Sequence, residues 1–244
     1  AYKQMTSEQN NFRRILLKIS GEALAGDLGF GIDPKLLSSL CSSVLDVQRR
    51  GVETALVIGG GNIFRGAALQ KAGFDRVAGD QMGMLATVMN GLAVREELKR
   101  QGGKAVLMSA YGIASITEQY QASRARQLLS EGVTVIASGG TGSPFFTTDT
   151  GAVLRAIEMQ CSEVLKATKV DGVYSADPMK DPNAERYTAL SFAEVISKQL
   201  KVMDLTAFAL ASEHNMPIRV FSMNKENAFI RAAMGEDEGT VVSN

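Results

Sequence analysis

The chain has 244 residues, of which 45% are hydrophobic and 21% are charged, and its formal net charge at pH 7 is zero. This composition is ordinary for a globular protein, and the length suits one large α/β domain or two small ones. The balanced charge argues against attraction to nucleic acid through bulk electrostatics, so any phosphate site must be local. No apolar run approaches the roughly 20 residues that span a bilayer. We therefore expect no nucleic-acid partner and no membrane partner.

Two further features concern location and the N-terminus. No apolar segment typical of a signal peptide occurs near the N-terminus. Cys41 and Cys161, both in segments of helical character, lack C-x-x-C spacing, so we expect reduced thiols and a cytoplasmic location. We predict residues 1–12 to be a flexible segment, and we interpret Ala1–Gln4, which precede Met5, as an addition to the natural chain.

From residue 13 onward, short apolar runs alternate with segments of helical character. In chain order we predict a strand over 15–19, a helix over 34–50, a strand over 54–58, a long helix within 76–100, a strand over 105–108, a helix over 117–130, a strand over 133–137, a helix over 148–160, a strand over 163–167, helices over 192–198 and 205–213, and late strands over 218–221 and 240–242. Asp33 and Pro34 suit the N-cap and first position of the second element. The alternation predicts one α/β domain over residues 13–244, a three-layer αβα sandwich around a mostly parallel sheet.

Three glycine-rich segments each follow an apolar strand. They are Lys18–Leu24, Gly59–Gly66 and Gly139–Asp149. Glycine lets backbone N–H groups approach a phosphate closely, and ligands of parallel sheets bind at the carboxyl ends of the strands. The sequence therefore predicts one crevice lined by phosphate-binding groups. Neither G-x-x-x-x-G-K-[ST] nor G-x-G-x-x-G occurs, so a P-loop or Rossmann site is not supported.

The motifs resemble those of the bacterial uridylate (UMP) kinases, a group within the amino acid kinase family. The resemblance covers the chain from about Arg13 onward and rests on Lys18–Leu24, Ile58–Gly66, Gly79–Thr87, Thr141–Asp149, Lys166–Tyr174, Lys201–Asp204 and Pro217–Phe221. Lys-x-Ser-Gly or Gly-Gly-Gly-Asn alone would mark only the wider family, whereas all these motifs in this order are specific.

The resemblance implies transfer of the γ-phosphate of ATP to UMP, with Mg²⁺, to give UDP and ADP. The residue chemistry agrees, because two anionic phosphates repel each other and Lys18 and Lys166, at the ends of separate strands, could bridge the transferring group. Arg65 offers a forked donor suited to the acceptor phosphate. A phosphate oxygen is already largely ionised at neutral pH, so no general base is required.

Site residues are carried over from the resemblance position by position. The catalytic residues would be Lys18, Lys166 and Asp204, the last orienting the catalytic lysine. ATP would be bound by Lys18, Ile19, Ser20, Gly21, Gly61, Arg65, Thr168, Tyr174 and Asp177. UMP would be bound by Gly60, Arg65, Asp80, Thr141, Gly142, Ser143, Pro144, Phe145, Phe146, Thr147 and Thr148. No protein ligand to a metal is predicted, because the nucleotide phosphates would hold most of the Mg²⁺ coordination.

Two positions in the third glycine-rich segment need comment. Ser143 stands where the family pattern usually has Asn, so one hydroxyl replaces an amide beside the uracil and backbone groups would have to compensate. We interpret Phe145 and Phe146 as anchors of the loop rather than as a stacking platform for the base.

The resemblance also implies a homohexamer, activation by GTP and inhibition by UTP, although Gln101–Lys104 and Ser115–Ser130, where GTP contacts would fall, match the pattern weakly. Two other functions stay open. One is a kinase of the same fold that acts on a carboxylate or carbamate, and the other is a sensor that binds uridine nucleotides without catalysis. A sensor would be expected to lack one of the two bridging lysines, and both are present.

Overall fold

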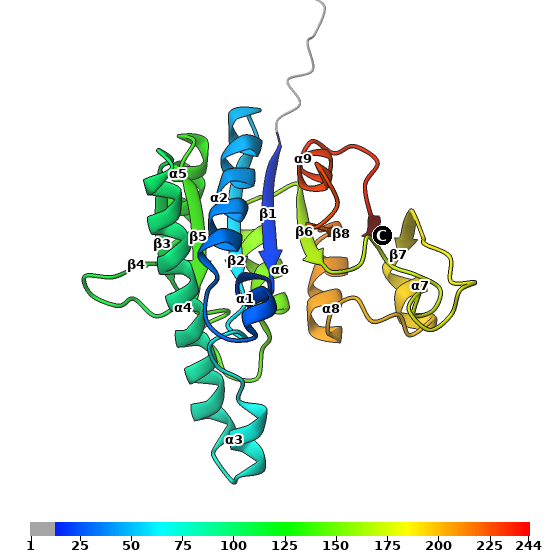
Figure 1. Ribbon diagram of the computed structural model, residues 1–244, viewed down its shortest axis with the longest axis horizontal. Coiled ribbons are helices and arrows are strands. Elements are labelled where there is room, and N and C mark those ends of the chain that lie inside the picture. Colours follow the sequence, from blue (N-terminus) through cyan, green and yellow to red (C-terminus); the bar gives the residue numbers. More distant parts are fainter. Residues whose placement is uncertain (1–12) are drawn as a thin grey trace, which may run out of the picture.

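The apolar runs form one nine-stranded sheet in the computed structural model, which describes residues 13–244 (Figure 1). The strands are β1 (Arg14–Ile19), β2 (Glu53–Ile58), β3 (Ala105–Ser109), β4 (Glu118–Gln119), β5 (Thr134–Ser138), β6 (Glu163–Thr168), β7 (Ala189–Ser191), β8 (Ile218–Ser222) and β9 (Thr240–Ser243). Their order across the sheet is β4-β3-β5-β2-β1-β6-β8-β9-β7. Within the described part of the chain, the pairing of β8 with β9 is antiparallel and the other pairings are parallel.

Helices cover both faces of this sheet. They are α1 (Glu22–Ala25), α2 (Pro34–Arg49), α3 (Ala67–Lys71), α4 (Arg76–Arg100), α5 (Ala122–Ser130), α6 (Thr148–Glu158), α7 (Phe192–Ser197), α8 (Leu205–Glu213) and α9 (Ala228–Ala233), with a 3₁₀ turn, η1, at Gly26–Leu28. As predicted, α2 begins after an Asp33 N-cap, whose side chain accepts a hydrogen bond from the backbone N–H of Lys35 at 2.8 Å.

Two cores result from the alternation of side chains along the strands. In β1, Ile15 and Leu17 face a core that α2, α4 and α9 close, whereas Leu16 faces a second core under α5, α6 and α8. The predicted three-layer α/β fold with a mostly parallel sheet is confirmed. The extent of the domain over residues 13–244 stays a prediction, and the prediction for residues 1–12 lies outside the described residues.

The central pair of strands marks a change of direction in the chain. From β1 the chain continues to the neighbouring β2, and only much later adds β6 on the other side of β1. Such a switch point leaves a crevice beyond the carboxyl ends of the two strands, because the following connections diverge to opposite sides. The β1–β6 junction is therefore the place where the fold favours a ligand.

Some sequence-based boundaries were wrong. The helix predicted over 117–130 begins at Ala122, because Glu118–Gln119 pairs with β3 as an edge strand. Cys161 follows the turn after α6 and does not lie in a helix. The prediction missed α1, α3, α9, β4 and β7, which are all shorter than seven residues. Short elements carry too few residues for a periodic pattern to identify them.

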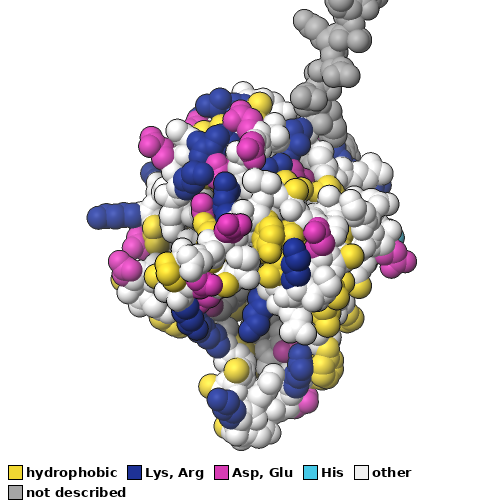
Figure 2. Space-filling model, turned by 90° about the vertical axis from the view of Figure 1, so that its right-hand side faces the viewer, with side chains coloured by type: hydrophobic (Ala, Val, Ile, Leu, Met, Phe, Trp, Pro, Cys, Tyr) yellow, Lys and Arg dark blue, Asp and Glu magenta, His cyan; other side chains and the backbone are white. Residues whose placement is uncertain are grey.

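Both cysteines are free and buried. Burial is the main cause that raises the pKa of each thiol to about 12, so neither is a reactive thiolate at neutral pH. On the face shown in Figure 2, basic and acidic side chains are interspersed. Between residues 13 and 244, no helix combines the length and apolarity needed to cross a bilayer.

Candidate active site

Lys18 and Lys166 meet at the junction of the two central strands. The parallel register pairs them directly, Lys18 in β1 with Lys166 in β6. Side chains alternate along a strand, so both lysines share the sheet face of Leu16 and Val164, which α6 covers. Asp149, in the first turn of α6, receives both ammonium groups: Lys18 Nζ lies 2.9 Å from Oδ1, and Lys166 Nζ lies 2.9 Å from Oδ2.

The net charge of the cluster formed by Lys18, Lys166 and Asp149 favours binding of an anion. Burial, the largest influence, acts to raise the pKa of Asp149, but the ammonium groups of Lys18 and Lys166 outweigh it and hold that pKa below its ordinary value. Two cations and one carboxylate leave an excess positive charge in a mostly buried place. Each ammonium group has three N–H donors, and Lys166 also donates to the carbonyl oxygen of Val202, so each lysine still has a donor for an incoming phosphoryl oxygen.

Asp204, which the resemblance implies orients the catalytic lysine, lies one step away from Lys18 and Lys166. Instead of contacting a lysine, it caps α8 by accepting the backbone N–H of Ala207 at 3.0 Å, and it accepts hydrogen bonds from the hydroxyls of Thr147 and Thr150. These two threonines belong to the beginning of α6, so Asp204 fixes the turn that presents Asp149. The expected orienting role of Asp204 stays a prediction, and the packing of α6 against α8 decides which carboxylate reaches the lysines.

The first two glycine-rich loops lie against each other. A Cβ on Gly21 would stand 2.7 Å from Gly59 O and 2.9 Å from Gly61 N, and a Cβ on Gly60 would stand 2.9 Å from Gly83 O. Contacts this short leave no room for a side chain. Gly21 is therefore required for the close approach of the loop after β1 to the loop after β2, and Gly60 for the close approach of the loop after β2 to helix α4.

The third glycine-rich loop closes on the same place. Its Thr148 Oγ1 would lie 3.7 Å from a Cβ on Gly59, and the backbone N–H of Gly139 donates to Thr87 Oγ1 of α4 at 2.9 Å. Gly139 and Gly142 have φ values of 79° and 83°, which glycine adopts without strain. The three glycine-rich loops therefore lie together, as the sequence predicts, and a single crevice lined by all three stays a prediction.

One cleft opens between α4 and these loops. It is lined by Gly60, Gly61, Phe64, Gly66, Gly79, Asp80, Gly83, Met84, Gly140, Phe146 and Thr148. Of the residues predicted to bind UMP, this lining contains Gly60, Asp80, Phe146 and Thr148. Gly61, predicted on the ATP side, lines it as well.

The other predicted UMP residues lie around this cleft rather than in its lining. Thr141, Gly142, Ser143, Pro144, Phe145 and Thr147 belong to the loop, and Arg65 lies beside it. The side chain of Phe145 sits under the guanidinium of Arg76, 4.7 Å from the ring centroid, and its N–H donates to Asp80 Oδ2 at 2.7 Å. Phe145 thus anchors the loop, whereas Phe146 lines the cleft. Ser143 is exposed.

Arg65 is held at the edge of the crevice by local contacts. Its guanidinium lies 2.9 Å from Glu22 Oε1 and donates to Gly61 O at 3.0 Å. The side chain is largely exposed, so the ion pair is weak and an incoming phosphate could replace Glu22 as the partner.

A second cleft, of about 530 Å³, opens on the other side of the lysines. It is lined by residues of β6, β8, the loop after β6 and the segment between α7 and α8: Lys166, Thr168, Val170, Gly172, Val173, Tyr174, Ser175, Ala176, Asp177, Pro178, Lys198, Gln199, Leu200, Lys201, Val202 and Val220. It therefore brings Thr168, Tyr174 and Asp177, which were predicted to bind ATP, together with Lys166, which was predicted to be catalytic. Ile19 is buried in the core, so only its backbone is available to a ligand, and Ser20 and Gly21 follow it at the crevice.

Sequence reasoning missed several residues of this site. Asp149 was recognised only as the end of a motif, although a carboxylate in the first turn of a helix after a glycine-rich loop is a usable signal. Lys198, which lies outside the motifs, and Lys201, the first residue of the Lys201–Asp204 motif, line the second cleft, although neither was assigned a role. Asn90 of α4, fully buried, donates to Gly59 O at 2.7 Å and exchanges two hydrogen bonds with Asn62, a contact that only the tertiary structure reveals.

Residues 13–244 contain no cluster of three or more His, Cys, Asp or Glu side chains that could hold a metal ion. Asp149, the carboxylate nearest the centre, is engaged by the two lysines. The donor set therefore fits a Mg²⁺ ion that arrives on nucleotide phosphates better than an ion held by protein ligands alone.

Comparisons with known proteins agree with this geometry. The sequence model of the amino acid kinase family matches residues 13–222. Uridylate kinase of Colwellia psychrerythraea is 58% identical over 98% of this chain and 96% of the relative, and uridylate kinase of Saccharophagus degradans is 56% identical over 95% and 94%. The crystal structure of UMP kinase from Bacillus anthracis matches with a TM-score of 0.92 and 37% identity, covering 95% of this chain and 96% of that one. The chain therefore belongs to the amino acid kinase family.

Proposed function

We propose that the protein transfers the γ-phosphate of ATP to UMP, giving UDP and ADP for pyrimidine nucleotide biosynthesis. The observation that carries the proposal is the pair of ammonium groups, Lys18 and Lys166, that meet on Asp149 between two clefts. The cleft beside Tyr174 and Asp177 would hold ATP, and the cleft beside Asp80 would hold UMP. The similarity to uridylate kinases along nearly the whole chain supports this assignment.

In this proposal the reaction needs positioning and charge more than acid–base chemistry. A phosphate oxygen of UMP, already ionised, attacks the γ-phosphorus; as that bond forms, the bond from the γ-phosphorus to the bridging oxygen breaks and ADP leaves with the electron pair. Lys18 and Lys166 donate to the equatorial oxygens of the transferring group and stabilise its charge. Mg²⁺ bound to the phosphates of ATP would neutralise further negative charge.

The surrounding residues have supporting roles in the proposal. Asp149 keeps the two ammonium groups beside each other despite their repulsion, and Asp204 fixes the turn that carries Asp149. Arg65 would exchange Glu22 for a phosphate. Asp80 would accept the ribose hydroxyls of UMP once the Phe145 N–H gives way. The backbone of Thr141–Thr148, more than the Ser143 hydroxyl, would recognise the uracil.

The proposal extends to assembly, regulation and location. The outward face of α4 exposes Met82, Leu85 and Met89, at 43%, 51% and 56%, which suits contact with a second copy of the chain and hence the proposed homohexamer. GTP as activator and UTP as inhibitor follow from the resemblance. We place the protein in the cytoplasm with its nucleotide substrates, without a nucleic-acid or membrane partner.

The test is a steady-state assay of ADP release with ATP and Mg²⁺. The acceptors are UMP, CMP and dUMP and, separately, acetylglutamate, aspartate and carbamate, each with and without GTP. We expect turnover with UMP, no turnover with the carboxylates or carbamate, and loss of nearly all turnover in Lys18→Ala with near-normal UMP binding. Turnover only with a carboxylate or carbamate would favour the other kinase function. UMP or UTP binding with background ADP release would favour the sensor.

A further inference from the structure

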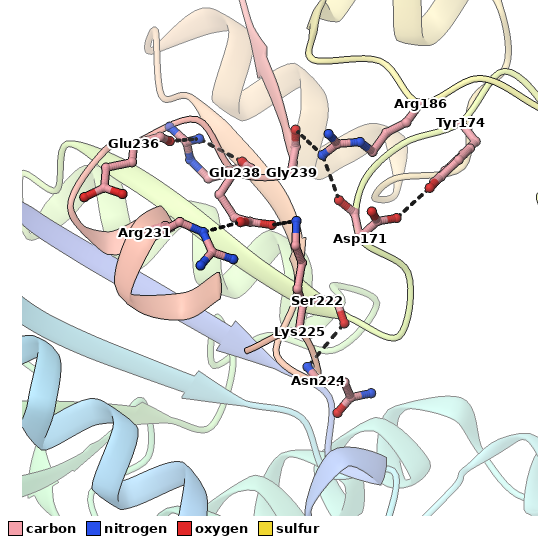
Figure 3. Close-up of polar contacts among 11 residues, drawn as sticks. Asp171, Tyr174, Arg186, Ser222, Asn224, Lys225, Arg231, Glu236, Glu238 and Gly239 are labelled. Atoms are coloured by element: carbon pink, nitrogen blue, oxygen red, sulfur yellow. Dashed lines mark hydrogen bonds and ion pairs between the residues drawn. The ribbon is translucent and has the colours of Figure 1, made fainter. Parts of the chain in front are cut away.

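The loop that lines the proposed ATP cleft rests on the C-terminal end of the chain. We call residues 169–188, between β6 and β7, the cleft loop, and residues 236–240 the C-terminal turn. The cleft loop supplies Tyr174 and Asp177 to the cleft, and most of its residues beyond Tyr174 are exposed. Its two ends are joined to the C-terminal turn, as Figure 3 shows for Arg186 and Gly239.

The C-terminal turn is rigidly held. Its Glu238 side chain, almost fully buried, accepts hydrogen bonds from Lys225 Nζ at 3.1 Å and from Arg231 Nε at 2.8 Å (Figure 3). Arg219 of β8 donates to the carbonyl oxygens of Glu236 and Glu238, each at 2.9 Å. Charge-assisted hydrogen bonds in a buried place are strong, so this turn is a fixed platform.

Thr240 joins this platform to the cleft loop at two points. Its Oγ1 accepts the backbone N–H of Val173 at 2.9 Å and donates to the carbonyl oxygen of Tyr187 at 2.5 Å. Thr240 is fully buried, so water cannot replace either bond. One hydroxyl thus ties the beginning of the cleft loop to its end, next to Tyr174.

Steric contacts show that the junction is tight. Gly239 has a φ of +67°, and a Cβ there would stand 2.0 Å from the carbonyl oxygen of Val220. A Cβ on Gly172 would stand 2.7 Å from Thr240 Oγ1. Arg186 adds a hydrogen bond to the carbonyl oxygen of Gly239 at 3.2 Å. The path of the cleft loop near Val173 is therefore fixed by Thr240 together with the backbone hydrogen bond from the Tyr187 N–H to the carbonyl oxygen of Val173 at 2.9 Å.

We propose that Thr240 is a positioning residue for ATP, which fixes the cleft loop so that Tyr174 and its neighbours meet the adenosine. The inference rests on the proposed function, because it assumes that this cleft takes ATP. Thr240 acts through Val173 and Tyr187 and touches no reacting atom. It should therefore affect the affinity for adenine nucleotides and leave UMP binding unchanged.

The experiment compares Thr240→Val, which keeps the branched shape and removes the hydroxyl, with Thr240→Ser, which keeps the hydroxyl. ADP affinity is measured by calorimetry, and KM for ATP and UMP by steady-state kinetics on the full chain. Thr240→Val should weaken ADP binding and raise KM for ATP roughly 2- to 30-fold, while KM for UMP stays within about twofold. Thr240→Ser should restore ATP binding. Ser243→Ala, which removes another hydroxyl from β9, should bind ADP as the wild type does.

Hydrogen exchange at the Val173 amide should be faster in Thr240→Val than in the wild type, because the amide loses its acceptor. Unchanged ADP affinity in Thr240→Val, or equal weakening of ADP and UMP, would overturn the inference. Should Thr240→Val fail to fold, Glu238→Gln, which weakens the platform under Thr240, takes its place. It should also lose ADP affinity selectively, and unchanged ADP affinity or equal weakening of ADP and UMP would again overturn the inference. Wild-type turnover with UMP tests the proposed function separately, since ADP affinity needs no acceptor.

Discussion

Asp149 connects the two lysines that would act on the transferring phosphoryl group. Its carboxylate oxygens each lie 2.9 Å from one ammonium nitrogen, and the three side chains are mostly buried. Removing one member of such a buried charged group leaves the others without compensation. Asp149 is therefore expected to matter for the geometry of the site even though it would not touch the nucleotide.

Asp149→Asn should lower kcat about 100-fold, because the lysines would repel each other and move from their places, and a displacement of about 1 Å can cost this much. KM for UMP should change little, since the UMP cleft is lined by other residues. Steady-state kinetics measures both values, with Asp46→Asn on the exposed face of α2 as the matched control. Unchanged kcat in Asp149→Asn would show that the lysines hold their positions without this carboxylate.

Asp80 lines the cleft proposed for UMP, and its carboxylate accepts the N–H of Phe145 at 2.7 Å. Asp80→Ala should raise KM for UMP about 10- to 100-fold, the effect expected when hydrogen bonds to a charged group are lost. KM for ATP should stay near its wild-type value. A selective rise in KM for ATP would show that this carboxylate contacts ATP and not UMP, and would contradict the prediction.

Helix α4 links the UMP cleft to the glycine-rich loop after β2. It carries Asp80 near one end and Asn90 two to three turns further on. The amides of Asn90 and Asn62 exchange hydrogen bonds of 2.7 and 3.0 Å, and Asn90 also donates to the carbonyl oxygen of Gly59. Both amides are buried, so the pair fixes the loop against the helix.

Asn90→Ala should destabilise the protein, because Asn62 and Gly59 O lose buried partners, at a cost of about 1–3 kcal/mol. For a chain of this length, that corresponds to a fall in Tm of roughly 2–12 °C. The loop would also loosen, so KM for UMP should rise. Thermal unfolding and kinetics test both effects. A stable variant with normal KM would mean that the glycine contacts alone fix the loop.

The polar and apolar surfaces of the whole molecule lead to two more predictions. One concerns self-association through the exposed stripe of α4. If the protein forms the proposed homohexamer through this stripe, Leu85→Lys, which places a charge in its middle, should shift the wild-type oligomer to smaller species in light scattering after gel filtration. Met234→Lys, an exposed apolar position after α9, should leave the mass unchanged. An unchanged mass in Leu85→Lys would exclude this face as the interface.

The second prediction for the whole molecule concerns its stability at low pH. The pKa values of Asp149 and Glu238 are both below their ordinary values of 3.8 and 4.5, because the hydrogen bonds and charges of their cationic partners outweigh burial, the largest single influence. A carboxyl group whose pKa is lower in the folded than in the unfolded protein stabilises the fold at any pH above its unfolded-state pKa. This stability is lost as the pH falls through the folded-state pKa. The free energy of unfolding, measured in urea, should be nearly constant from pH 7 to about 5 and should fall below about pH 4.5. A loss of stability between pH 7 and 6 would contradict this assignment.

The strand-end motifs could be recognised from the amino-acid order alone, because each lies in one continuous segment and each signals close backbone approach. For the same reason the alternation of apolar runs and helices predicted the layers of the fold. The β1–β6 pairing that makes Lys18 and Lys166 neighbours depends on contacts between distant segments. Three other features depend on distant segments in the same way. They are the contact of the lysines with Asp149 rather than Asp204, the Asn62–Asn90 amide pair, and the support of the cleft loop by Thr240. Packing and register decide these contacts, and no local pattern encodes them.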